Sequence, residues 1–217
     1  MGAGVSRGEG PVVSIGSVRE QLFLSAEIEA ERFLAVLRLV AVLVLALAVS
    51  AALLAVELPP PAARRQLVAA GVVLALYAGN GLIAFWAARP GRFRPWMPWL
   101  FTTADCALVL FNVASTVVNT GAPPATAWVF PAIWLAPLVL VFGSLHYRPW
   151  LQGYAAALVV GGLALLLAIL PDDGELERIL PLLDLPPTVV RIVLLALAGF
   201  VLVLAASRRK ALLGRAV

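Results

Sequence analysis

The chain has 217 residues, of which 62% are hydrophobic and only 13% are charged. Soluble domains are roughly 45–50% apolar and about 25% charged, so this composition excludes a soluble domain and indicates an integral membrane protein whose main partner is the lipid bilayer. The net charge of +4 does not indicate a nucleic-acid partner, because the basic residues lie at the ends of apolar segments, where membrane topology places them.

The N-terminal part of the chain changes character near residue 17. Residues 1–16 are rich in Gly, Ser and Val without periodicity and predict a disordered lead. Residues 17–37 place Leu22, Phe33 and other apolar side chains near one face, and so predict an amphipathic cytoplasmic helix. The charged side chains fall elsewhere on this helix, at Arg19, Glu20, Glu27 and Glu31. We expect the helix to lie on the membrane surface, to pack on a second copy of the chain, or to stiffen the first span.

Six apolar runs follow, each close to the roughly 20 residues that a helix needs to cross about 30 Å of hydrocarbon. They predict an all-α, multi-pass fold with a six-helix transmembrane domain over 38–206. A basic cytoplasmic tail over 207–217 is expected to start a transducer helix. The predicted spans are Arg38–Val56, Gln66–Ala88, Trp99–Asn119, Thr126–Leu145, Trp150–Leu170 and Val189–Ala206.

The basic residues predict the orientation of these spans. Most of them lie in the N-terminal segment, in the second and fourth connections and in the tail, so both termini are expected to be cytoplasmic. The residues expected at the cytoplasmic interface are Arg92 and Arg94 in the second connection and His146 and Arg148 in the fourth. The run around His146 predicts an interfacial turn.

The third span carries a carboxylate, Asp105, which is expensive to expose to hydrocarbon and is therefore expected to face the bundle interior or a wet cavity. At about 100° per residue, Asp105 shares one stripe with Asn112, Thr116 and Asn119. Asn80 of the second span lies at a similar predicted depth and is expected to hydrogen-bond Asp105. Asp105 either ties spans two and three together, takes a sensing, ligand-binding or proton-binding role, or contacts a second copy. Because no base is evident within the spans, this acid gives little support to a transport pathway.

Two prolines, Pro131 and Pro137, lie inside the predicted fourth span. An interior proline removes a backbone hydrogen bond and bends a helix, so this span is a candidate hinge, with a static bend as the alternative. The glycines on either side of Asn80 and the pair Gly161 and Gly162 in the fifth span indicate close approach of helices.

No catalytic, metal-binding or phosphate-binding motif is recognisable in the sequence. The single cysteine, Cys106, lies within the third span and has no second cysteine with which to form a disulfide or a zinc site. The sequence therefore predicts no catalytic residue, no metal site and no cofactor for this chain.

Four stretches give the chain a resemblance to a known family. They are GRFRPWMPWLF before the third span, TTADCALVL at its start, HYRPWLQGYAAAL between spans four and five, and ASRRKALLGRA at the end. In this order, after a charged amphipathic helix, they resemble the N-terminal membrane region of bacterial class III adenylate/guanylate cyclases over most of residues 20–217. Six-span sensor regions of histidine kinases are similar in plan, including an acidic residue early in span three.

The resemblance implies a homodimer in the bacterial inner membrane whose last span continues into a cytosolic cyclase domain. The metal-binding aspartates and the transition-state Asn/Arg pair of that domain have no counterpart here. Mg and ATP are therefore expected only for a domain that this sequence does not include, and no cyclase catalytic residue carries over.

The function expected from this resemblance is that of a membrane anchor and sensor module. Its last span would pass a membrane signal, from a lipophilic or other small ligand, to a cytosolic output domain. The alternatives are the sensor region of a histidine kinase and a small six-span transporter, which would require a lumen with more polar groups than these spans supply.

Overall fold

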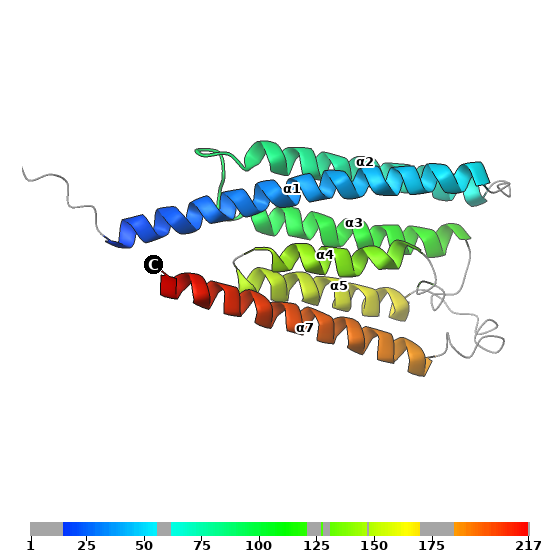
Figure 1. Cartoon of the computed structure of the whole chain (residues 1–217). Coiled ribbons are helices and arrows are strands. Elements are labelled where there is room, and N and C mark those ends of the chain that lie inside the picture. The colour runs from blue at the N-terminus through cyan, green and yellow to red at the C-terminus, as the bar shows by residue number, and fades with distance from the viewer. Residues whose placement is uncertain are drawn as a thin grey trace, which may run out of the picture.

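The computed structural model describes residues 15–55, 62–120, 127, 131–146, 148–169 and 185–216. These residues are almost all helical and hold no strand, which confirms the all-α fold class. A short 3-10 helix, η2 (Pro131–Trp134), precedes the fourth helix. The helices are α1 (Ile15–Ala55), α2 (Ala62–Ala87), α3 (Met97–Thr120), α4 (Leu135–Ser144), α5 (Pro149–Ile169) and α7 (Leu185–Ala216) (Figure 1).

Successive helices run in alternating directions along one common axis (Figure 1). α1 packs on α2, α2 on α3, and α3 on α4 and α5, while α7 packs on α4 and α5. The start of α1 and the end of α7 therefore lie at the same end of the bundle (Figure 1). This arrangement divides the bundle into a half formed by α1, α2 and α3 and a half formed by α4, α5 and α7.

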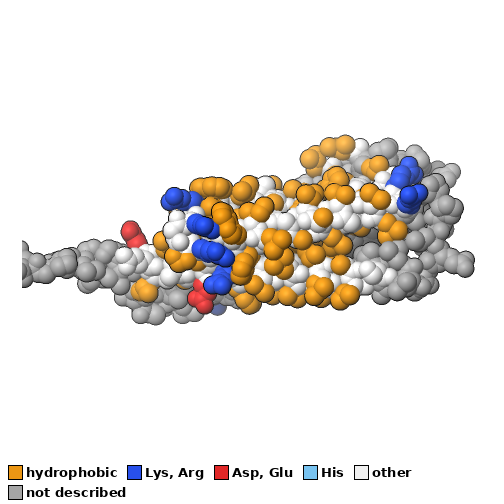
Figure 2. All heavy atoms as spheres, turned by 90° about the horizontal axis from the view of Figure 1, so that it is seen from above, with side chains coloured by type: hydrophobic (Ala, Val, Ile, Leu, Met, Phe, Trp, Pro, Cys, Tyr) orange, Lys and Arg blue, Asp and Glu red, His pale blue; other side chains and the backbone are white. Residues whose placement is uncertain are grey.

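Four of the described helices are long and apolar enough to cross a membrane, over 64–87, 97–119, 149–169 and 191–208. Figure 2 shows hydrophobic side chains over most of one face, between two groups of Lys and Arg at its ends. Many large apolar side chains are exposed, among them Leu47 at 62% and Val68 at 62%. Apolar side chains are stable in contact with lipid, whereas exposing them to water costs free energy. The chain is therefore a membrane protein.

The predicted first and fourth spans differ from the other four. The first forms the C-terminal part of α1, which continues as a single helix from the amphipathic segment, so no break separates the two predicted elements. Within the fourth, the described part is a 10-residue α-helix preceded by one 3-10 turn. An α-helix of that length is shorter than the hydrocarbon is thick.

The two prolines explain the short fourth helix. Pro131 begins η2, and Pro137 lies in the first turn of α4. A proline in the first turn removes no hydrogen bond, because the amides there have no partner within the helix. The two prolines thus lie at the starts of two successive helical segments, and a hinge or a static bend at these positions stays a prediction.

The N-terminal and C-terminal predictions fall partly within the described chain. Residues 15 and 16 belong to α1, whereas the rest of the predicted disordered lead lies outside the described residues. At the other end, α7 continues through Ala216, so the predicted basic tail extends the last helix.

The main apolar core lies where α3, α4 and α5 meet, and α7 covers it. Its fully buried members include Val109 of α3, Ala136 and Leu140 of α4, and Val159 of α5. Small residues set the helix spacing around this core. A Cβ added to Gly199 of α7 would stand 2.8 Å from the Cβ of Ala156 on α5, closer than two such atoms can approach.

Gly199 offers a test of this packing. We expect Gly199→Leu to separate α5 from α7 and to lower the free energy of unfolding by about 1–3 kcal/mol, the usual cost of overpacking. The matched control is Gly161→Leu on α5, because Gly161 has no neighbour within 4 Å of an added Cβ. The readout is the midpoint of thermal unfolding in detergent micelles, and equal midpoints for the two variants would contradict the described packing.

Candidate functional site

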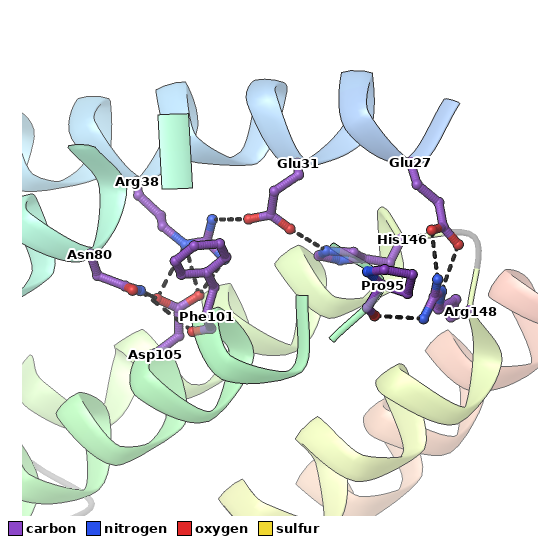
Figure 3. Close-up of polar contacts among 9 residues, drawn as sticks. All are labelled: Glu27, Glu31, Arg38, Asn80, Pro95, Phe101, Asp105, His146 and Arg148. Carbon is purple, nitrogen blue, oxygen red and sulfur yellow. Dashed lines mark hydrogen bonds and ion pairs between the residues drawn. The ribbon is translucent and has the colours of Figure 1, made fainter. Parts of the chain in front are cut away.

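The most polar feature of the bundle interior is a chain of charged side chains centred on Arg38 of α1 (Figure 3). Its Nη1 donates to Glu31 Oε1 at 2.9 Å, and its Nε donates to the two carboxylate oxygens of Asp105 at 2.8 and 3.2 Å. Glu31 and Arg38 are seven residues apart, so they lie on the same face of α1. Both are almost completely buried, with 0% and 1% of their surface exposed.

Asp105 of α3 receives a second donor from α2. Asn80 Nδ2 donates to Asp105 Oδ1 at 2.8 Å, which confirms the predicted hydrogen bond between the second and third predicted spans. The same amide lies 3.4 Å from the backbone carbonyl oxygen of Phe101, whose ring faces the Arg38 guanidinium at 6.0 Å. The interpretation that Asp105 has no base is wrong, because Arg38 is buried beside it.

The other end of the chain of charges is His146, which follows α4. His146 Nε2 lies 2.8 Å from Glu31 Oε2. An ionised carboxylate can only accept, so Nε2 carries the hydrogen of this bond. The sequence predicts a turn at this position and the structure has one, but the ring is buried instead of lying at an exposed interface.

A second, more exposed ion pair lies one helical turn away. Arg148 donates to both carboxylate oxygens of Glu27 at 2.6 and 2.7 Å, and its Nη1 donates to the backbone oxygen of Pro95 at 2.9 Å. Pro95 belongs to the turn between α2 and α3. Arg148 thus joins α1 to both connections that the sequence places on the cytoplasmic side (Figure 3).

We call the seven side chains Glu27, Glu31, Arg38, Asn80, Asp105, His146 and Arg148 the charge network. It connects α1 to α2, to α3 and to the turn between α4 and α5. Within the fully buried part, two carboxylates face one guanidinium and one imidazole. The arrangement can therefore fix the position of α1.

Two further predicted polar residues of α3, Thr116 and Asn119, contact α2 further along the helix. Gln66 Nε2 donates to Thr116 Oγ1 at 2.7 Å, and Asn119 Nδ2 donates to Gln66 Oε1 at 3.2 Å. The backbone oxygen of Asn112 accepts the Thr116 hydroxyl at 2.7 Å. The predicted stripe is therefore an inward-facing surface, and it contacts α2 at two levels.

Other predicted site residues stand apart from the charge network. The Arg92 guanidinium lies over the ring of Trp86 at 4.1 Å, and Arg94 is exposed. Pro137 lines a groove between α4 and α7. Among the side chains that the structure describes, no group of three or more His, Cys, Asp and Glu residues could hold a metal ion.

Sequence reasoning missed Glu31 and Arg38 as site residues. The signal that would have found them is the spacing of Glu27, Glu31 and Arg38 along one helix face, at intervals of four and seven residues. A charged stripe on a helix that leads into an apolar span must face either water or a charged partner, and Asp105 offers such a partner.

No protein-family model, curated protein or solved structure matches this chain.

The pair of Arg38 and Asp105 should be energetically coupled. Arg38→Met leaves Asp105 without its counter-charge and Glu31 with His146 alone, and should cost about 3–5 kcal/mol of unfolding free energy, as should Asp105→Leu. The double variant should lose less than the sum of the two single losses, by about 0.5–3 kcal/mol, because it removes both members of the pair. The measurement is denaturant unfolding in micelles, with Arg64→Met at an exposed arginine as control. Additive losses would show that the two side chains do not interact.

Glu31 should make stability depend on pH. Burial alone would raise the pKa of Glu31 above its usual 4.5, but the hydrogen bond from His146 and the charge of Arg38 lower it in the folded chain. A lowered pKa in the folded state means that the carboxylate stabilises the fold above its usual pKa, and that this contribution is lost as the pH falls through the lowered value.

We therefore expect the difference in unfolding free energy between the wild type and Glu31→Gln to shrink as the pH falls below about 4.5. Glu20→Gln, at an exposed position of the same helix, is the matched control and should show no such trend. A difference that stays constant down to the acid limit of the fold would contradict the buried ion pair.

Proposed function

We propose that this chain is the membrane anchor and sensor module of a class III adenylate cyclase-type signalling protein. In this proposal it forms a homodimer of six-span protomers in the bacterial inner membrane with both termini in the cytoplasm. It passes a membrane signal through α7 to a cytosolic output domain. The resemblance of the linker, turn and tail motifs supports the cyclase assignment, and the charge network supports the sensor role.

The charge network is the single observation that carries the sensor role. An unpaired charge inside the bundle costs several kcal/mol, so positions of α1 that break these contacts are disfavoured. The proposal requires a second packing of α1 in which the charges are paired again, so that α1 switches between discrete packings instead of bending continuously. A ligand can then act by binding one packing more tightly than the other.

A path from the charge network to the output side runs through the second half of the bundle. His146 and Arg148 hold the turn that joins α4 to α5. α7 packs on both of these helices and continues as one helix from Leu185 to Ala216. A displacement of α1 against this turn therefore moves the helices on which α7 rests, and α7 extends toward the same end of the bundle (Figure 1).

The alternating directions of the helices support six crossings. The apolar C-terminal part of α1 packs on α2, and α4 packs on α5. If both cross the membrane together with the four apolar helices already described, the number of crossings is even and both termini lie on one side. The excess of Arg and Lys in the segments at that end supports a cytoplasmic location for it.

A small transporter is the second candidate. The observation that favours it is the buried pair of Arg38 and Asp105, because intramembrane acids and bases commonly mark ion or proton pathways. A sensor and a transporter differ in what the native protein does when the network is altered, so one experiment separates them.

The test uses the native gene product in its own membranes, with an N-terminal tag. We expect a product heavier than the 22.9 kDa of this chain that forms cyclic AMP or cyclic GMP from the corresponding nucleoside triphosphate. Glu31→Gln, which alters the charge network with little change of shape, should change that activity at least threefold at equal expression. The exposed Glu20→Gln should leave it unchanged.

A tagged product of the mass of this chain with no cyclase activity would overturn the cyclase proposal. A heavier product whose activity is the same in the wild type and in Glu31→Gln would limit the module to anchoring. Proton uptake by vesicles containing the wild type, abolished in Asp105→Asn, would favour the transporter.

A further inference from the structure

A groove of about 910 Å³ lies between α4 and α7, on the side of the bundle away from the charge network. Its walls are apolar: Ile133, Ala136 and Leu140 line one side, and Leu195 and Leu202 line the other. Ligand sites in proteins commonly have volumes of roughly 300–1,000 Å³ and walls of this kind with a few polar groups. The groove is therefore large enough for a substantial apolar ligand.

One charged side chain lines the groove among the described residues, Arg191 of α7. Among the residues that the structure describes, its buried Nη1 atom has no hydrogen-bond partner, while the side chain as a whole is partly exposed. A guanidinium nitrogen is a donor only, and a buried donor without an acceptor is costly. The occupant of the groove should therefore bring an anion to Arg191 as well as apolar surface to the walls.

The position of Arg191 along α7 indicates where that anion lies. Arg191 is the first residue of the apolar stretch of α7, and Leu202 lies eleven residues further along the groove. At about 1.5 Å per residue this distance is roughly 16 Å, or about half of the 30 Å hydrocarbon thickness. The groove thus extends from the headgroup level to the middle of the bilayer, which is the length of one leaflet.

We propose that the groove between α4 and α7 binds one anionic membrane phospholipid, with its phosphate on Arg191 and an acyl chain along the walls. Arginine binds phosphate through two parallel hydrogen bonds, and a phosphate at the edge of the hydrocarbon meets Arg191 at its own depth. Neighbouring side chains on α7 are exposed, with Leu197 and Val201 at 55% each, so lipid reaches the groove directly. The site is independent of whether the chain serves a cyclase.

The experiment reconstitutes the full chain in phosphatidylcholine vesicles that contain phosphatidylglycerol with a photoactivatable diazirine in one acyl chain. After irradiation, mass spectrometry of peptides locates the label. We expect adducts on the α4 and α7 walls, and we expect Arg191→Gln to reduce them at least fivefold. Arg64→Gln, at an exposed arginine of α2, should leave this labelling unchanged.

A second variant keeps the charge and fills the groove. Ala198→Trp places a large side chain in the lining, and we expect it to reduce labelling of the walls while Arg191 is intact. Thermal unfolding midpoints of all variants in micelles establish that a loss of labelling is not a loss of fold.

Three outcomes would overturn the proposal. Labelling spread evenly over all lipid-facing helices, and unaffected by either variant, would show a surface without a site. Competition by oleate but not by unlabelled phosphatidylglycerol would assign the groove to a free fatty acid. Crosslinks between two copies through α7, with walls protected from label, would assign it to a second copy of the chain.

Discussion

The structure depends on the buried guanidinium of Arg38, which bridges Glu31 and Asp105. Taking charged groups out of water costs several kcal/mol for each ion, and only close pairing with well-directed hydrogen bonds offsets that cost. Arg38 meets this condition because its planar group serves one carboxylate on its own helix and another on α3. The pairing fixes both the rotation of α1 and its position along the bundle axis. A shift by one residue would turn Arg38 away from Asp105 by about 100° and leave Asp105 without its guanidinium partner.

This constraint explains why the charged face of α1 lies inside the bundle and much of its apolar face lies outside. Leu22 and Phe33 of α1 are about half exposed, at 49% and 55%, while Glu31 on the same helix is fully buried. In a water-soluble protein such a helix would turn its apolar face toward the core, because burial of apolar surface would stabilise the fold. Here the apolar face stays on the surface, where lipid or a second copy can cover it, and the acidic face meets His146 and Arg148.

Sequence reasoning predicted correctly the contact that follows from the helical period alone. Asp105 had to face inward, and Asn80 was level with it, so their hydrogen bond could be predicted from two helices alone. Arg38 was assigned to the cytoplasmic end of the first span, because a basic residue at the edge of an apolar run is usually an interfacial anchor. The partners of Arg38 are Asp105, on another helix, and Glu31, which in turn contacts His146. Local patterns contain no information about such distant pairings.

The short fourth helix was missed for a related reason. The sequence alone does not distinguish a proline in the first turn of a helix from one in its interior.

α4 links the two features that carry the functional proposals. Its residues Ala136, Pro137, Leu140 and Val141 line the groove against α7, and five residues beyond Val141 the chain reaches His146 in the charge network. Gly143, between them, lies so close to Gln152 that a Cβ would meet its side-chain oxygen, so α4 and α5 are closely packed there. Filling the groove and repositioning the charge network would therefore act on the same short helix. Under the two proposals, a lipid bound at Arg191 would stabilise the position of α4 that keeps the groove open, and the contact of His146 with Glu31 would transmit that preference to α1.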